Sequence, residues 1–282
     1  MTDRAFRFGV VAGPTPTGTD WISTAQRAEE LGYDILLAPD TLYTFAPFPA
    51  VAAAAAGTRA LRVGTYVLSA PNRAPGLVAW ETRTLTVLTG GRFELGLGGG
   101  RPGADRDAAA LGGDFGTPAD RLRRVADTIR AVRDSALLPG ADGFPRPPIL
   151  VAASRPRMLR LAAEQADIVA LGLPPGTTEE ELAGTAGTLR KLAGSRFDEL
   201  EVHINVAVVA ESLDAIPDGA SRMVGGDPRA MAAAGGVAFL VGTPGRIADV
   251  LRRRRDELGI SYIGVSSTCM EQFAPVIDRL RG

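Results

Sequence analysis

The sequence contains few of the side chains that bind metals or act as nucleophiles. In 282 residues it has one cysteine, Cys269, and one histidine, His203. A single cysteine excludes an intramolecular disulfide, and one cysteine with one histidine is too few for a zinc site of that type. The only lysine, Lys191, falls within a helical pattern rather than at a strand end, which argues against Schiff-base chemistry. We therefore expect no metal, and a bound cofactor that carries out the chemistry.

Strong net charge and long apolar runs are also missing. The formal net charge of −1 argues against nucleic acid or an anionic membrane as a partner. The alanine-rich run over residues 50–56 is too short to span a bilayer, and no apolar run near the N-terminus is typical of a signal peptide. The sequence thus predicts a cytoplasmic protein with a small-molecule partner.

Short apolar strand patterns alternate with helical patterns along the chain. Strands are predicted over residues 6–12, 34–39, 62–68, 92–97, 149–152, 167–171, 201–209 and 260–265. Helices are predicted over 20–31, 48–57, 75–88, 118–135, 155–165, 228 onward, 244–258 and 270–281, with one more beginning after Thr178. The stretches 104–116, 139–148 and 215–226 are predicted to be loops.

Alternation of this kind predicts the α/β class with a parallel sheet, and eight units over this length predict a (β/α)8 TIM barrel. The absence of a shift in composition predicts a single domain over residues 1–282. A doubly wound open sheet is the structural alternative.

In a barrel, ligands bind where the strands end and the βα loops begin. Each of five predicted strands ends beside residues that suit a site. These are Asp40, Thr41 and Tyr43; Ser69 to Arg73; Gly98, Gly99, Gly100 and Arg101; Ala153, Ser154 and Arg155 to Arg157; and Gly172.

The glycine-rich stretch 98–103 matches the pattern G-x-G-x-x-G and follows a predicted strand. Pro102 lies inside the pattern, no clear helix opens there, and the strand is the fourth rather than the first, which argues against a dinucleotide fingerprint. Close approach of a flat ligand to bare backbone is the preferred interpretation, and a plain loop is the alternative.

The segment Ser154-Arg155-Pro156-Arg157 opens a predicted helix. Free backbone N–H groups, the Ser154 hydroxyl and two guanidiniums would together bind an anion. The alternative is that Ser154 only caps the helix while the arginines are solvated. His203 falls in the middle of a predicted strand, on the helix-facing or core side of the barrel, where a structural role is expected and a catalytic role is the alternative.

Five segments resemble the luciferase-like monooxygenase superfamily, and within it the actinobacterial coenzyme F420-dependent oxidoreductases. They are GYDILLAPD, LRVGTYVLSAPNRAPGLVAWETRTLTVLTGGRFELGLGGG, SRPRMLRLAAEQADIVALG, VGTPGRIADVLRRRRDELGISYIGV and MEQFAPVIDRL. The resemblance covers nearly the whole chain. It implies a (β/α)8 barrel, usually a homodimer, that binds a deazaflavin or FMN at the C-terminal mouth.

The resemblance also implies roles for particular residues. A non-prolyl cis peptide at the end of the third strand would back the cofactor ring, and Ser69-Ala70 matches its position. The loop of Gly98 to Arg101 would lie against the ring, and the segment from Ala152 to Arg157 would hold the phosphate, with Gly172 beside it.

The chain departs from the family pattern in a loop after the fourth strand that looks shortened, in Ala152-Ala153 where Gly-Gly is usual, and after the second strand. Many members have Asp-His after the second strand, whereas this chain has Asp40-Thr41. Because Thr41 cannot act as an acid near neutral pH, Asp40, Tyr43 or a group of the substrate would supply a proton. Asp40 is thus a candidate for both catalysis and cofactor binding.

Three functions remain open from the sequence. The first is hydride transfer between coenzyme F420 and a small organic substrate. The second is an FMN-dependent monooxygenase supplied with reduced flavin. The third is a ligand-binding relative without catalytic activity, which would fit the missing histidine.

Overall fold

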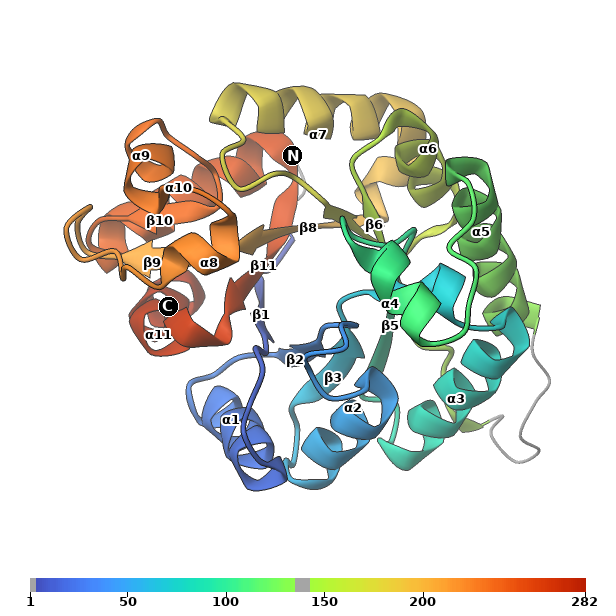
Figure 1. The fold of residues 1–282 in the computed structure, drawn as a ribbon. Coiled ribbons are helices and arrows are strands. Elements are labelled where there is room, and N and C mark those ends of the chain that lie inside the picture. The colour runs from blue at the N-terminus through green and yellow to red at the C-terminus, as the bar shows by residue number, and fades with distance from the viewer. Residues whose placement is uncertain (1–3, 135–142) are drawn as a thin grey trace.

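Eight parallel strand positions close into a ring in the part of the chain that the structure describes, residues 4–134 and 143–282 of this computed structural model (Figure 1). In chain order the strands are β1 (Arg7–Val11), β2 (Ile35–Ala38), β3 (Arg62–Thr65) with its continuation β4 (Leu68–Ser69), β5 (Phe93–Gly98), β6 (Ile149–Ala153), β7 (Ile168–Leu171), β8 (Glu201–Val206) and β11 (Ile260–Ser266). Pairing of β3 with β5 at Val63–Phe93 closes the ring. The predicted TIM barrel is confirmed, and the open-sheet alternative is wrong.

Helices surround the ring and cover its outer face (Figure 1). They are α1 (Gly18–Glu30), α2 (Pro47–Ala56), α3 (Pro75–Leu88), α4 (Ala104–Ala110), α5 (Pro118–Asp134), α6 (Pro156–Gln165), α7 (Glu179–Ala193), α8 (Ala220–Val224), α9 (Pro228–Ala233), α10 (Pro244–Leu258) and α11 (Met270–Arg281). Several begin at sequence signals: Thr178 and Glu181 form a capping box at α7, and Thr243 caps α10. Within the described residues, the helices are all too short or too polar to cross a lipid bilayer.

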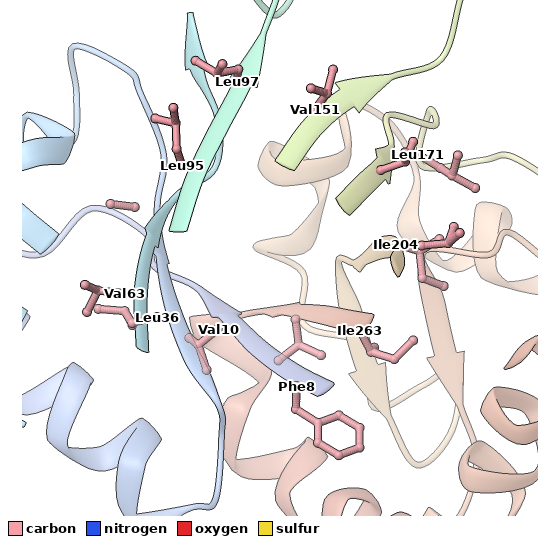
Figure 2. Close-up of a cluster of buried hydrophobic side chains, with 14 of the residues drawn as sticks. Phe8, Val10, Leu36, Val63, Leu95, Leu97, Val151, Leu171, Ile204 and Ile263 are labelled. Carbon is pink, nitrogen blue, oxygen red and sulfur yellow. The ribbon is translucent and has the colours of Figure 1, made fainter. Parts of the chain in front are cut away.

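The core has two layers because alternate residues of a strand point to opposite faces. Side chains that face the helices form a large cluster that includes Phe8, Leu36 and Ile263 (Figure 2). The neighbouring positions Leu37 and Tyr262 belong to a second cluster, with Ile35, Leu150, Ile168 and Ala170. The second cluster fills the barrel interior beneath the mouth.

The structure differs from the prediction in two predicted loops and one predicted strand. The stretch predicted as a loop over 104–116 holds α4, and the loop predicted over 215–226 holds α8. The predicted strand 201–209 divides into β8 and β9 (Val208–Ala210), and β9 pairs with the unpredicted β10 (Phe239–Val241) outside the ring. Short elements such as these have too few residues to show the hydrophobic periodicity of a helix or a strand. Ser135 and residues 139–142 of the predicted connector lie outside the described residues.

Candidate functional site

Two adjoining cavities open at the end of the barrel where the strands terminate. The inner cavity, of about 380 Å³, is lined by residues from the ends of β2 to β7, among them Asp40, Tyr66, Ser69, Gly98, Arg101 and Gly172. The outer cavity, of about 510 Å³, is lined by Arg121, Leu122, Arg155, Pro156, Arg157 and Met158, among others. The two share Gly99, Gly100, Ala152 and Ser154. A ligand with a flat head and a long tail could therefore occupy both.

Asp40 organises the rim of the inner cavity. Its carboxylate accepts hydrogen bonds from both terminal nitrogens of Arg73, at 2.5 and 2.9 Å, and from the backbone N–H of Ser69 at 2.8 Å. The pair is largely buried, so this two-point bond is far less screened than one at the surface. Asp40 thus fixes the segment after β4 against the end of β2.

The non-prolyl cis peptide lies between Tyr66 and Val67, so its predicted position at Ser69-Ala70 is wrong. The chain departs from regular strand geometry directly after Thr65. A Cβ on Gly96 of β5 would lie 2.0 Å from the Thr65 carbonyl oxygen, so β3 and β5 approach each other there as only glycine allows. Ala70 is buried at the start of a short 3-10 turn and does not line the inner cavity.

The glycines after β5 are explained largely by packing. A Cβ on Gly98 would lie 2.8 Å from Val67 Cγ2, and one on Gly100, where φ is +94°, would lie 2.5 Å from the Phe115 ring. Gly99 has ordinary room, and the nearest atom to a Cβ on Gly172 is 3.9 Å away. Packing therefore requires glycine at positions 98 and 100, whereas at Gly99 and Gly172 it leaves room for a side chain or a ligand.

The Ser69 hydroxyl is buried and has no hydrogen-bond partner among the described residues, and Ser69 is one of the residues that line the inner cavity. A buried hydroxyl that makes no hydrogen bond is costly, by about 1–3 kcal/mol. A ligand with a polar ring edge would satisfy it. The unpaired Ser69 hydroxyl and the open space beside Gly172 are together compatible with a flavin-like ring.

The outer cavity carries three guanidiniums. Arg155 and Arg157 are exposed at the start of α6, and Arg121 reaches in from α5, with its guanidinium over the Phe115 ring at 4.4 Å and a hydrogen bond to the Gly116 carbonyl. Ser154 is exposed and does not cap α6, so that prediction is wrong: Arg155 is the N-cap and no side chain caps the helix. The first N–H groups of α6 are therefore available to an anion.

Tyr43 and Arg101 lie together at the mouth. The Tyr43 ring is 67% exposed, and the Arg101 guanidinium lies 5.6 Å from its centroid. Arg101 lines the inner cavity and is paired with Asp107 of α4 at 2.5 Å, whereas Tyr43 is not among the residues that line either cavity. The structure brings Asp40 and Arg101 to the site and leaves Tyr43 beside it.

His203 lies in the barrel interior below the inner cavity. It is fully buried; its Nδ1 is 3.4 Å from the Tyr66 hydroxyl oxygen, and its ring packs edge-on against Tyr262. Burial lowers the pKa of His203 to about 3, with the charge of Arg7 adding to the effect, so the ring is neutral. The sequence left open which face of the strand carries His203, and in the structure its ring lies between Tyr66 and Tyr262.

Sequence reasoning missed Tyr66 and Arg121. Tyr66 reads as one more residue of an apolar strand, and only the break in that strand brings its ring into the inner cavity. Arg121 is one of several arginines on an amphipathic helix, and no signal in the sequence marks it. In residues 4–134 and 143–282, no group of three or more histidine, cysteine or acidic side chains is arranged to hold a metal ion.

Comparison with known proteins reveals one family. The family model described as luciferase-like monooxygenase matches residues 6–262. The chain is 43% identical over 82 residues to a 4-hydroxyprotoasukamycin monooxygenase of Streptomyces nodosus subsp. asukaensis, covering 29% of this chain and 21% of that protein. It is 30% identical over 173 residues to an F420-dependent glucose-6-phosphate dehydrogenase of Beutenbergia cavernae, covering 52% of this chain and 51% of that protein. The matches thus span about half, or less, of these relatives.

A solved structure shares the fold over almost the full length. The F420-dependent tetrahydromethanopterin reductase of Methanopyrus kandleri superposes with a TM-score of 0.71 at 17% identity, covering 97% of each chain. At this identity the likeness shows the barrel fold alone. The relatives include both F420-dependent enzymes and monooxygenases.

Proposed function

Since the chain belongs to the luciferase-like monooxygenase family, we propose that it is a coenzyme F420-dependent oxidoreductase that transfers a hydride between the deazaflavin and a small organic substrate. When bound, the deazaflavin supplies the ring carbon that gives or takes the hydride. The chain's own residues bind it, orient it and handle the proton.

The observation that carries this proposal is the cluster of Arg121, Arg155 and Arg157 around the outer cavity. The tail of F420 bears a phosphate and several carboxylates, whereas FMN bears a single phosphate. Three guanidiniums and the free N–H groups of α6 exceed what one phosphate needs, so their number favours the longer polyanion.

The inner cavity would hold the ring. We assign Ser69, Gly99 and Gly172 to contacts with it, Asp40 to the support of the Ser69 segment through Arg73, and Arg101 to the rim. Ala153, Ser154 and Arg155 would bind the part of the ligand between the two cavities. Gly98, Gly100 and Ala70 support these walls from behind, and Tyr43 is left as a mouth residue that could contact substrate.

A double variant tests the anion site. Ser154→Ala with Arg155→Ala should weaken F420 binding by about 10- to 100-fold, since it removes a charge-assisted contact. It should change the affinity for the deazaflavin compound that lacks the phosphate tail by less than about twofold. Equal losses for both ligands would refute the assignment. Arg123→Ala, which removes an exposed guanidinium on the same helix as Arg121, is the matched control.

An FMN-dependent monooxygenase is the second candidate, favoured by the 43% identity to the 4-hydroxyprotoasukamycin monooxygenase. Oxygen consumption with reduced FMN, together with an absence of F420 binding, would establish it.

The surface suggests a second copy of this chain as a partner. Helix α2 has no charged residue, and Leu77, Trp80 and Leu88 of the adjacent α3 are 44%, 54% and 72% exposed on one side of that helix. Two such faces bury each other in a symmetric dimer, so we propose a homodimer through α2 and α3. A cytoplasmic location and a single domain over residues 1–282 stay predictions.

A further inference from the structure

Hydride transfer to a carbonyl in the inner cavity requires a group that donates a proton, and few of the residues that line the cavity have such a group. Among the residues that line it, Asp40, Tyr66 and Arg101 are those with titratable side chains. The Arg101 guanidinium is bonded to Asp107, and both Asp40 carboxylate oxygens accept hydrogen bonds, from Arg73 and from the Ser69 N–H. The Tyr66 hydroxyl remains.

We propose that Tyr66 is the catalytic proton donor of the inner cavity and that His203 positions its hydroxyl. The proposal rests on the hydride-transfer function proposed above. It assigns a role to the chain's one histidine, which the sequence left as structural.

The His203 ring determines where the tyrosine proton can point. Its Nδ1 lies 3.4 Å from the Tyr66 oxygen, while its Nε2 is buried with no partner among the described residues. A neutral imidazole carries one N–H, and a buried N–H without an acceptor is rarer in proteins than an acceptor left without a donor. The proton therefore belongs on Nδ1, where it is donated to the Tyr66 oxygen. The O–H of Tyr66, a residue that lines the cavity, is then not donated to His203 and is available to a ligand.

The surroundings keep the Tyr66 hydroxyl protonated and the His203 ring neutral, as the proposed roles require. Burial raises the pKa of Tyr66, so the hydroxyl keeps its proton until an acceptor forms beside it. The charged group that acts on His203 is Arg7, and the Tyr262 ring packs against its edge. Arg7 is itself paired with Glu94 at 2.8 Å and with Glu201 at 3.2 Å, so its charge is partly balanced by these two carboxylates.

In the direction of carbonyl reduction, the carbonyl group of the substrate receives a hydride and a proton. The carbonyl carbon gains the hydride as its new C–H bond, and the C=O π electrons move to oxygen. That oxygen takes the proton from Tyr66 and becomes a hydroxyl. The tyrosinate is held by the Nδ1–H of His203 and regains a proton from water through the open mouth when the product leaves. The transfer is favourable because an alkoxide is a stronger base than a phenolate.

The first test is independent of turnover. Because His203 is the only histidine, nitrogen-15 NMR of the labelled protein shows one imidazole. We expect the neutral Nδ1–H form at pH 7, and a shift of the Nδ1 signal in Tyr66→Phe. An Nε2–H form would overturn the proposal, since Tyr66 would then donate its proton to the ring.

The second test uses reduced F420 and a panel of small ketones and aldehydes in stopped flow. Tyr66→Phe should slow hydride transfer about 10²- to 10⁴-fold, the usual contribution of a general acid, while the Kd for F420 stays within about twofold. His203→Asn, which keeps a donor near the Nδ1 position, should retain more of the rate than His203→Leu. An unchanged rate in Tyr66→Phe, or equal rates in the two His203 variants, would contradict the proposed roles.

Tyr33→Phe is the matched control. It also removes a buried tyrosine hydroxyl, bonded to the Met270 carbonyl far from the cavity, and should leave the hydride-transfer rate unchanged. If the wild-type protein reduces nothing in the panel, the proposed function has failed, and the NMR tautomer still decides the assignment of Tyr66 and His203.

Discussion

At the scale of single residues, the site depends on buried polar groups whose partners are supplied by the fold. Asp40 is satisfied by Arg73 and the Ser69 N–H, whereas the Ser69 hydroxyl and His203 Nε2 lack partners among the described residues. Unsatisfied groups cost stability, so they are expected where a ligand or a reaction uses them. Ser69 and Tyr66 both line the inner cavity, and His203 Nδ1 lies 3.4 Å from the Tyr66 hydroxyl oxygen.

His203 makes stability depend on pH. Its pKa falls from 6.5 in the unfolded chain to about 3 in the folded protein, so the unfolded chain binds more protons below pH 6.5. The stabilisation is therefore complete above pH 6.5 and is lost progressively as the pH falls toward 3. At pH 5 the wild type should have lost about 2 kcal/mol relative to His203→Asn.

Urea unfolding of both proteins between pH 7 and 5 checks this. Burial raises the pKa of Glu201, which acts in the opposite direction, but that effect is common to both proteins and cancels in the difference. Parallel stability curves for the wild type and the variant would contradict the burial of a neutral His203.

At the scale of elements, a buried carboxylate joins three strands at the end of the barrel opposite the site. Glu94 of β5, with a side chain 2% exposed, accepts hydrogen bonds from Arg7 of β1 at 2.8 Å and from Arg62 of β3 at 2.7 Å. Because its removal leaves two guanidiniums without their main partner, Glu94→Ala should lower the free energy of unfolding by about 2–3 kcal/mol.

The control for Glu94 is an exposed ion pair. Glu271→Ala removes a partner of Arg27, where both side chains are about half exposed, and should lower the free energy of unfolding far less than Glu94→Ala does. Denaturant unfolding of both variants gives the comparison. Similar losses would show that Glu94 does not hold the strands together.

The sequence predicts an element well where its hydrophobic periodicity extends over many residues. It predicts the backbone poorly where a single contact between distant residues determines the local conformation. The helices α1, α3 and α10 follow amphipathic patterns with clear caps or stops. The cis peptide at Tyr66-Val67 comes directly after Thr65, which lies close to Gly96 of another strand. No local sequence pattern encodes a contact between two strands. Asp40, Ser69 and Gly98, which are candidates because they follow predicted strands, line the inner cavity, whereas no sequence pattern marks Tyr66, which lines it too.

At the scale of the whole molecule, the two cavities and the apolar side of α2 and α3 lie on different parts of the barrel. The cavities occupy the mouth, where the strands end. The apolar residues Leu77, Trp80 and Leu88 lie along an outer helix. Cofactor binding and dimer formation can therefore be altered separately.

Trp80→Glu tests the dimer. The wild type should sediment as twice the 29.4 kDa chain mass, and the variant as a monomer, because a buried, unpaired carboxylate in the interface is unfavourable. Leu213→Glu, on the segment after β9, is the control and should remain dimeric. A wild type that sediments as a monomer would exclude this interface.

The most direct test of the proposed function is a spectral titration of the purified protein with F420 and with FMN under the same conditions. The three guanidiniums of the outer cavity predict saturable binding of F420, at least about tenfold tighter than that of FMN, with the difference reduced by Arg121→Ala. Saturable binding of FMN with no binding of F420 would contradict the assignment of this protein to F420-dependent chemistry.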